Sequence, residues 1–125
     1  RRITVEEALD ALRRSHEAGL VHMAYVMKGE EKPQLICSCC TCCCHTLGGL
    51  LHHGISTQVL TSKLIAEDEA QKCISCGKCV ERCVFGARTM VDGVLIYDVS
   101  RCFGCGLCVS RCSTNVIKLV KHKMS

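Results

Sequence analysis

Apolar and polar residues in the first part of the chain follow the period of an α-helix. Apolar side chains recur at intervals of three and four residues at Val5, Leu9 and Leu12, and His16 continues the spacing. Residues at these intervals lie on one face of a helix. The pattern therefore predicts a helix over about residues 5 to 18.

Flanking residues define the ends of this helix. Thr4 and Glu7 have the form of a capping box at its start, and Gly19 suits the position that follows a helix end. After it, the apolar run Leu20–Met27 predicts a short strand or turn. Pro33, the single proline, marks the boundary to a cysteine-rich zone.

The second half of the chain contains an internal repeat with an offset of 29 residues. The offset aligns four cysteines with four others, and it also aligns Gly77 with Gly106. Random alignment does not place eight cysteines in register. Each half is therefore expected to contain a loop, a short helix that starts at the third cysteine, and a strand. The two sets are Cys73, Cys76, Cys79, Cys83 and Cys102, Cys105, Cys108, Cys112.

A hairpin is expected between the halves. The segment Met90–Leu95 places Asp92 and Gly93 between short apolar runs, and Asp-Gly is a favoured central pair of a tight turn. We interpret this hairpin as a connector.

An uncharged stretch of 28 residues, from Leu35 to Ser62, is long enough to span a bilayer. It contains six cysteines, three histidines and a Gly-Gly pair, and a helix that faces lipid does not tolerate these polar, metal-binding groups. We therefore expect no membrane span. The chain divides instead into an N-terminal region, residues 1–57, and a repeat domain, residues 58–125.

Cysteine dominates the composition, with 14 of 125 residues. The length allows one compact domain with an extension and excludes a large multidomain enzyme. No basic segment followed by an apolar one opens the chain, so we expect a reducing, cytoplasmic location in which cysteines bind metals. The chain begins with Arg1 rather than Met, and we expect it to be part of a longer polypeptide.

Charge and aromatic content narrow the possible partners. Lys and Arg number 16 and Asp and Glu number 12, which gives a formal charge of +4 without a run of basic residues. Two Phe, two Tyr and no Trp do not supply a platform on which bases stack. Nucleic acid is therefore not expected as a partner.

Each half has the spacing Cys-x-x-Cys-x-x-Cys-x-x-x-Cys, which suits an iron-sulfur cubane. Three cysteines at intervals of three allow a tight loop to wrap one cluster, and the fourth, beyond the turn into a helix, points toward the neighbouring cluster. On this interpretation, each cluster takes its fourth ligand from the other half. Cluster I takes Cys73, Cys76, Cys79 and Cys112, and cluster II takes Cys102, Cys105, Cys108 and Cys83.

At these cysteines the sequence resembles the bacterial-type dicluster ferredoxins, over roughly 60 residues. The resemblance implies an α+β, ferredoxin-like domain with pseudo-twofold symmetry and two [4Fe-4S] clusters that transfer single electrons at low potential. The N-terminal helical, cysteine-rich region is then an extension of this domain. The family usually has Pro after the fourth cysteine of each motif, whereas Val84 and Ser113 stand there in this chain. This departure affects the local helix end, the cluster packing and therefore the potentials.

Three glycines in the repeats are candidates for cofactor contact: Gly77, Gly104 and Gly106. Glycine lets backbone amides approach cluster sulfurs, although these residues also suit simple turns. Zinc is the alternative metal, since eight cysteines can hold two zinc ions with four thiolates each. Zinc sites normally use two separated Cys-x-x-Cys pairs per ion, so the spacing favours iron-sulfur clusters.

A second group of cysteines precedes the repeat domain, with six in eight residues. This density argues against disulfides, because adjacent cysteines pair only with strain and a reducing compartment opens such bonds. We expect four of the six to hold a third iron-sulfur cluster. A larger cluster that uses His45 or bridging thiolates, soft-metal binding, and free thiols that carry sulfur are the open alternatives. The six are Cys37, Cys39, Cys40, Cys42, Cys43 and Cys44.

The remaining residues do not suggest a catalytic site. No nucleophile-base pair, phosphate-binding glycine loop or paired carboxylate stands out. His52 and His53 are expected to face solvent, and His16 and His22 to be structural.

The cysteine-rich segment, preceded by a helix that ends in Ala18–His22, also resembles extensions fused before dicluster ferredoxin modules in iron-sulfur proteins of anaerobes. The chain is thus expected to be an electron-transfer module with redox partner proteins in an oxidoreductase assembly. Loading two clusters takes the formal charge from +4 to about 0, which suits a module fixed in an assembly. The alternatives are a catalytic subunit with a substrate-binding cluster at residues 37–44, and a protein that handles metal or sulfur.

Overall fold

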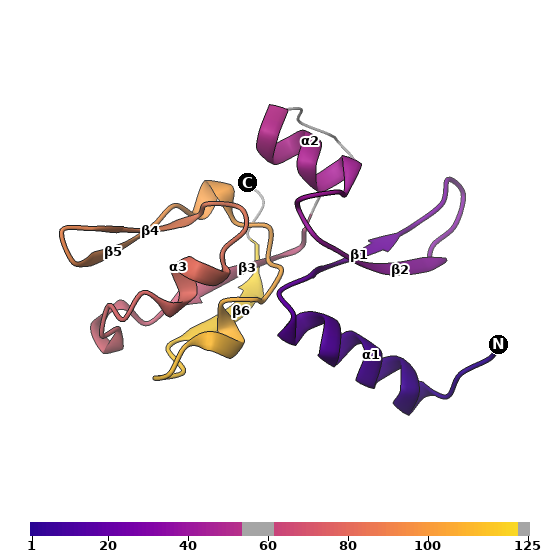
Figure 1. Cartoon of the computed structure of the whole chain (residues 1–125), viewed down its shortest axis with the longest axis horizontal. Coiled ribbons are helices and arrows are strands. Elements are labelled where there is room, and N and C mark those ends of the chain that lie inside the picture. Colours follow the sequence, from indigo (N-terminus) through magenta and orange to yellow (C-terminus); the bar gives the residue numbers. More distant parts are fainter. Residues whose placement is uncertain (54–61, 123–125) are drawn as a thin grey trace. The chain divides into compact units, whose positions relative to one another are not determined.

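A computed structural model describes residues 1–53 and 62–122 of the chain (Figure 1). The chain divides into two compact units, a first unit of residues 1–56 and a second unit of residues 57–125. The domain boundary expected from the sequence, between residues 57 and 58, lies outside the described residues. Within the described ranges, no helix is both long enough and apolar enough to cross a membrane.

The first unit begins with helix α1, which spans Val5–Glu17. Thr4 and Glu7 form the capping box, each side chain accepting a hydrogen bond from the other residue's backbone N–H. Gly19 follows the helix with a φ of 84°, the left-handed conformation that glycine adopts without steric cost. The helix expected over residues 5 to 18 is confirmed, including both of its end signals.

A hairpin and a second helix complete the first unit (Figure 1). Strands β1 (Val21–Tyr25) and β2 (Leu35–Cys39) pair antiparallel, and helix α2 spans His45–His53. Leu47 of α2 is fully buried, and Val21 of β1 is buried as well. The strand expected within residues 20 to 27 is confirmed as β1, whereas the sequence pattern did not predict β2 or α2.

The described residues of the second unit, 62–122, form four strands and four short helical segments, which gives a small α+β fold. Strand β3 pairs antiparallel with β6, and β4 pairs antiparallel with β5. The elements are β3 (Leu64–Asp68), η1 (Ala70–Lys72), α3 (Lys78–Arg82), β4 (Arg88–Val91), β5 (Val94–Tyr97), η2 (Val99–Arg101), η3 (Val109–Arg111) and β6 (Ile117–Lys121).

The sequence repeat is visible in the order of these elements. Segments η1 and η2 begin 29 residues apart, and so do β4 and β6. Each half runs from a ligand loop through a short helix to a strand, as expected, although the helix of the second half is only the 3-10 turn η3. The spatial pseudo-twofold relation between the halves stays a prediction.

The expected hairpin joins the two halves. Asp92 and Gly93 lie between β4 and β5 with φ values of 50° and 77°, which is the conformation of a type I′ turn. The connector predicted from the Asp-Gly pair is confirmed.

Cysteine side chains form part of the core of the second unit. The buried cluster consists of Ala66, Cys79, Cys108, Val116 and Ile117. Two of these five residues carry sulfur and none is aromatic. Large apolar side chains therefore contribute little buried surface to this core.

We expect Thr4→Ala to destabilise α1 by about 1 kcal/mol, because it removes the acceptor for the Glu7 N–H. Amide hydrogen exchange across Val5–Glu17 measures the effect. Thr4→Ser keeps the hydroxyl and serves as the control. Equal protection in the alanine variant and the parent would show that the cap does not stabilise this helix.

Candidate metal centres

Four cysteines line one cavity of the second unit, which we call the first cavity. They are Cys73, Cys76, Cys79 and Cys112, and the empty space is about 340 Å³. Apolar side chains such as Leu95 and Ile117 complete the lining. Three of the cysteines come from the first ligand loop and its helix, and Cys112 comes from the other half of the repeat.

The remaining four cysteines of the repeat line a second cavity. They are Cys83, Cys102, Cys105 and Cys108, and the empty space is again about 340 Å³. Phe85, Phe103 and Leu107 contribute apolar surface. The structure thus brings together the two sets of four that the spacing assigns to clusters I and II, while ligation itself stays a prediction.

Two short helices place the exchanged cysteines. Cys83 is the residue that caps the C-terminal end of α3, and Cys112 occupies the same position at the end of η3. Each therefore lies one helical segment beyond its own ligand loop. This placement lets each residue line the cavity of the opposite half.

Left-handed residues bend both ligand loops at equivalent positions. Ser75 and Gly104 precede the second cysteine of their motifs, with φ values of 54° and 66°. Gly77 and Gly106 follow it, with φ values of 78° and 77°. The backbone therefore turns on both sides of the second cysteine, which curls each loop around its cavity.

Gly104 has a second reason to be glycine. A Cβ atom at this position would clash with the backbone carbonyl oxygen of Leu64 in β3. The contact brings the second ligand loop against the β3–β6 sheet. Contact of Gly77, Gly104 and Gly106 with a cofactor stays a prediction.

Backbone amides already donate to several cavity sulfurs, including those of Cys73 and Cys102. The N–H of Ser75 donates to Sγ of Cys73, and the N–H of Ala66 donates to Sγ of Cys102, both at 3.4 Å. Such N–H···S hydrogen bonds favour the negative charge of a thiolate. Neither of these two donors is one of the three glycines, Gly77, Gly104 and Gly106.

Burial controls the protonation of several cavity thiols. It raises the pKa of Cys79 and Cys105, and it raises the pKa of Cys108 to about 11. Burial also acts to raise the pKa of Cys112, but hydrogen bonds led by the N–H of Val116 outweigh it and lower the value. Metal loading must therefore displace protons from the buried thiols.

Residues 72–117 match the family model of a 4Fe-4S dicluster domain. This segment is a ferredoxin-type iron-sulfur module. The match includes all eight repeat cysteines and favours iron-sulfur clusters over the zinc alternative. No curated protein gives a significant match to the chain. We refer to residues 72–117 as the dicluster domain.

In the first unit, the six clustered cysteines separate into two sets. The strand set consists of Cys37 and Cys39 of β2 together with Cys44. Sγ of Cys39 lies 3.2 Å from Sγ of Cys37, because residues two apart in a strand share a face. Burial, followed by the interaction with Cys37, raises the pKa of Cys39 to about 12.

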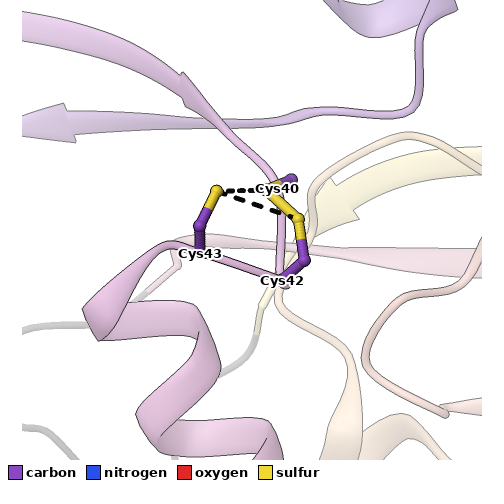
Figure 2. A group of neighbouring side chains, drawn as sticks. All are labelled: Cys40, Cys42 and Cys43. Carbon is purple, nitrogen blue, oxygen red and sulfur yellow. Dashed lines mark hydrogen bonds between the residues drawn. A yellow bond between two sulfur atoms is a disulfide. The ribbon is translucent and has the colours of Figure 1, made fainter.

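The turn set consists of Cys40, Cys42 and Cys43 (Figure 2). The three sulfur atoms lie within 4.8 Å of one another, close enough to bind one metal ion. Sγ of Cys43 lies 3.0 Å from Sγ of Cys40 and 3.8 Å from Sγ of Cys42. All three residues belong to the turn between β2 and α2.

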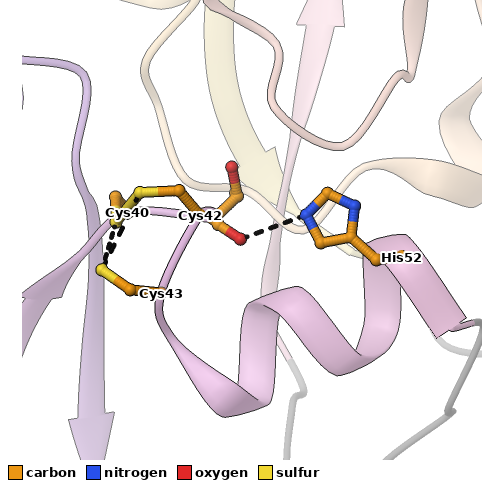
Figure 3. Close-up of a disulfide and its surroundings, with 5 residues drawn as sticks. Cys40, Cys42, Cys43 and His52 are labelled. Atoms are coloured by element: carbon orange, nitrogen blue, oxygen red, sulfur yellow. Dashed lines mark hydrogen bonds between the residues drawn. A yellow bond between two sulfur atoms is a disulfide. The ribbon is translucent and has the colours of Figure 1, made fainter.

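The expectation that this segment contains no disulfide is wrong for one pair. Cys40 and Cys42 are joined by a disulfide (Figures 2 and 3). The turn between them brings their Cα atoms to 5.5 Å, which is a normal separation for a disulfide. Sequence spacing alone did not reveal this turn.

Helix α2 anchors the turn set. The ring Nε2 of His52 lies 3.3 Å from the carbonyl oxygen of Thr41 (Figure 3), so the imidazole donates a hydrogen bond to the turn. His52 is exposed, as the sequence analysis expected, but it also makes this contact. His45 and His53 are exposed at the two ends of the helix.

Sequence reasoning missed three polar residues that contact one another. Arg88 and Tyr97 belong to the dicluster domain, and Asp68 lies just before it. Arg88 is buried, forms an ion pair with Asp68, and lies over the ring of Tyr97. A signal was present, because the 29-residue offset aligns Arg88 with the apolar Ile117. Arg88 is thus charged where the equivalent residue of the other half is apolar, and this mismatch in the sequence indicates that the two halves differ at this position.

We expect Gly104→Ala to impair metal loading of the second cavity. The alanine adds left-handed strain of about 1–2 kcal/mol and a clash with the Leu64 carbonyl. Iron and acid-labile sulfide counted per chain after anaerobic reconstitution should fall by about four atoms each.

Gly93→Ala is the matched control for this variant. Gly93 has a φ of 77° and no atom within 4 Å of the added Cβ, so it introduces strain without the clash. A full iron content in both variants would contradict the role assigned to the close approach at Gly104.

Proposed function

We propose that the chain is an electron-transfer module that holds two [4Fe-4S] clusters in its second unit and relays single electrons between redox partner proteins. The observation that carries the proposal is the lining of the two cavities. Each contains four cysteines, three from one half of the repeat and the fourth from the other. This is the crossed arrangement expected of a two-cluster module.

The chain's own residues would bind the clusters and control their surroundings. Cys73, Cys76, Cys79 and Cys112 would ligate cluster I, and Cys102, Cys105, Cys108 and Cys83 would ligate cluster II. The clusters, when bound, supply reversible one-electron chemistry. Apolar residues such as Leu95 and Leu107 exclude water from the cavities, and the N–H groups of Ser75 and Ala66 stabilise thiolate charge.

We further propose that the cysteines of residues 37–44 hold a third iron-sulfur cluster. Six soft ligands in eight residues and three sulfurs within 4.8 Å support a metal centre. The Cys40–Cys42 disulfide must first open. An external dithiol would supply the two electrons and two protons that convert the disulfide to two thiols, and would itself become a disulfide.

The proposed setting is a larger oxidoreductase assembly, or a longer polypeptide, in the reducing cytoplasm of an anaerobe. The formal charge of +4 becomes about 0 with two clusters loaded. A module with little net charge is not steered over long distances to its partners. Fixed attachment to those partners fits this charge better than free diffusion.

Metal content distinguishes these functions. We expect about twelve irons per chain after anaerobic reconstitution in the presence of dithiol, and about eight when Cys40, Cys42 and Cys43 are all replaced by Ser. Ser38→Ala, on β2 between the strand cysteines, is the control and should keep the parent iron content.

Other outcomes of this count exclude parts of the proposal. Eight irons in the parent would exclude the third cluster and leave the two-cluster relay in place. Zinc or copper at residues 37–44 in place of iron would support a metal-handling role for the first unit. A colourless protein with two lone ions per chain would contradict the relay.

We also expect iron removal to abolish the cooperative unfolding of the second unit. Cys79 and Cys108 belong to its small buried core, and the exchanged ligands connect its halves. Circular dichroism during thermal unfolding, before and after anaerobic chelation, measures the effect. An unchanged transition in the chelated protein would show that the apolar residues alone hold the fold.

A further inference from the structure

A buried ion pair lies beside both cavities. The side chain of Arg88 is 1% exposed, and its two terminal nitrogens donate to the two carboxylate oxygens of Asp68, each at 2.6 Å. The guanidinium also lies over the ring of Tyr97, with Cζ 4.3 Å from the ring centroid. Bidentate pairing and stacking hold the cation in one orientation.

The two charges face different cavities. Arg88 lines the second cavity, with Cys83, Cys102, Cys105 and Cys108. Asp68 lines the first cavity, with Cys73, Cys76, Cys79 and Cys112. The ion pair therefore presents a positive charge to one cavity and a negative charge to the other.

The effects on individual sulfurs differ between the cavities. Besides burial, which raises the pKa of Cys79, the charge and a side-chain hydrogen bond of Arg88 lower that pKa, and Asp68 opposes Arg88 by raising it. At Cys108, burial raises the pKa to about 11 and Arg88 opposes the rise. Arg88 thus acts on a sulfur of each cavity, and Asp68 weakens its effect at the first cavity, whereas no carboxylate is among the leading influences on the pKa of Cys108.

The cation is permanent. Burial alone would lower the pKa of Arg88, but the hydrogen bonds to Asp68 and the nearby thiols keep it above its usual value. A guanidinium does not lose its proton in proteins. The electrostatic difference between the cavities therefore persists at any physiological pH.

The repeat contains no copy of this pair. The 29-residue offset aligns Arg88 with Ile117 and Asp68 with Tyr97. Ile117 is buried in the core, and the hydroxyl of Tyr97 donates to the carbonyl oxygen of Ala66 at 2.6 Å. The two halves, similar in their ligand loops, thus differ in charge at this one buried point.

We propose that the Arg88–Asp68 ion pair makes the two iron-sulfur sites unequal in reduction potential, so that one electron from an external donor resides preferentially at the Cys83, Cys102, Cys105 and Cys108 site. The inference rests on the proposed two-cluster function. A nearby cation stabilises the added negative charge of a reduced site, and a nearby carboxylate destabilises it. The low dielectric of a buried site strengthens both effects. Arg88 and Asp68 are then residues that tune the sites without ligating them.

The test is a potentiometric titration, followed by EPR, of the reconstituted full chain carrying Arg88→Met and Asp68→Leu. The double substitution removes both charges and leaves the net charge unchanged. We expect the two reduction potentials to move closer together in this variant. The equilibrium constant for electron exchange between the sites should approach one by at least tenfold, which corresponds to a decrease of about 59 mV in the difference between two one-electron potentials.

The matched control is Glu67→Gln with Lys118→Met. Glu67 neighbours Asp68 on β3 and pairs with Lys118 on β6, but the charges of this pair are 3.8 Å apart and its side chains are 59% and 61% exposed. Solvent screens such a pair. Its removal should leave the separation of the potentials unchanged.

Ligand substitutions identify the site that holds the first electron. Cys105→Ser marks the second site and Cys76→Ser the first, because an oxygen ligand alters the EPR signal of its own cluster. We expect the signal that appears first on reduction to change with Cys105→Ser. A first signal that changes with Cys76→Ser instead would overturn the assigned direction.

Two single variants keep the proposal testable if the double variant does not fold. Arg88→Lys retains the cation and should leave the difference between the two reduction potentials unchanged. Asp68→Asn should decrease this difference, because removal of the carboxylate charge raises the reduction potential of the first site. If Asp68→Asn and the double variant both kept their full iron content and the parent's difference in reduction potential, that result would overturn this inference and would leave the two-cluster function standing. A parent chain without two cluster signals would overturn both.

Discussion

The organisation of the second unit depends on the exchange of cysteines between its halves. Cys83 and Cys112 each end a short helical segment of one half and line the cavity of the other. Each cavity is lined by only three cysteines of its own half and takes the fourth from the other half. Buried cysteines also belong to the core, so ligation of the proposed clusters by these residues would couple metal binding to folding.

Sequence reasoning was most accurate where local chemistry determines structure. The capping box at Thr4, the Asp92-Gly93 turn and the loops of the repeat all follow from residues within a few positions of one another. Strand β2 and helix α2 were missed, because cysteines carry little secondary-structure preference and two glycines disfavour a helix. The partner of Arg88 was also unpredictable, since Asp68 lies 20 residues away and their contact depends on tertiary structure.

The cysteine-rich segment of the first unit is divided by a change in backbone conformation. Cys37 and Cys39 alternate with Ser38 along β2, whereas the next cysteines follow a turn. A dense run that looks uniform in the sequence therefore presents two distinct sulfur groups. Hydrogen bonding from α2 to Thr41 fixes the turn, so the position of the second group depends on a helix that carries none of its sulfurs.

The two ligand loops are not interchangeable, even though their backbones bend alike. Ser75 carries a side chain at the position that Gly104 occupies in the other loop, where the Leu64 carbonyl leaves no room for a Cβ atom. A chimera with the first loop grafted into the second half would meet this obstruction, whereas the reverse graft would place a glycine at the position of Ser75 and would not meet it. At this position the second loop accommodates glycine alone, whereas the first loop accommodates a side chain.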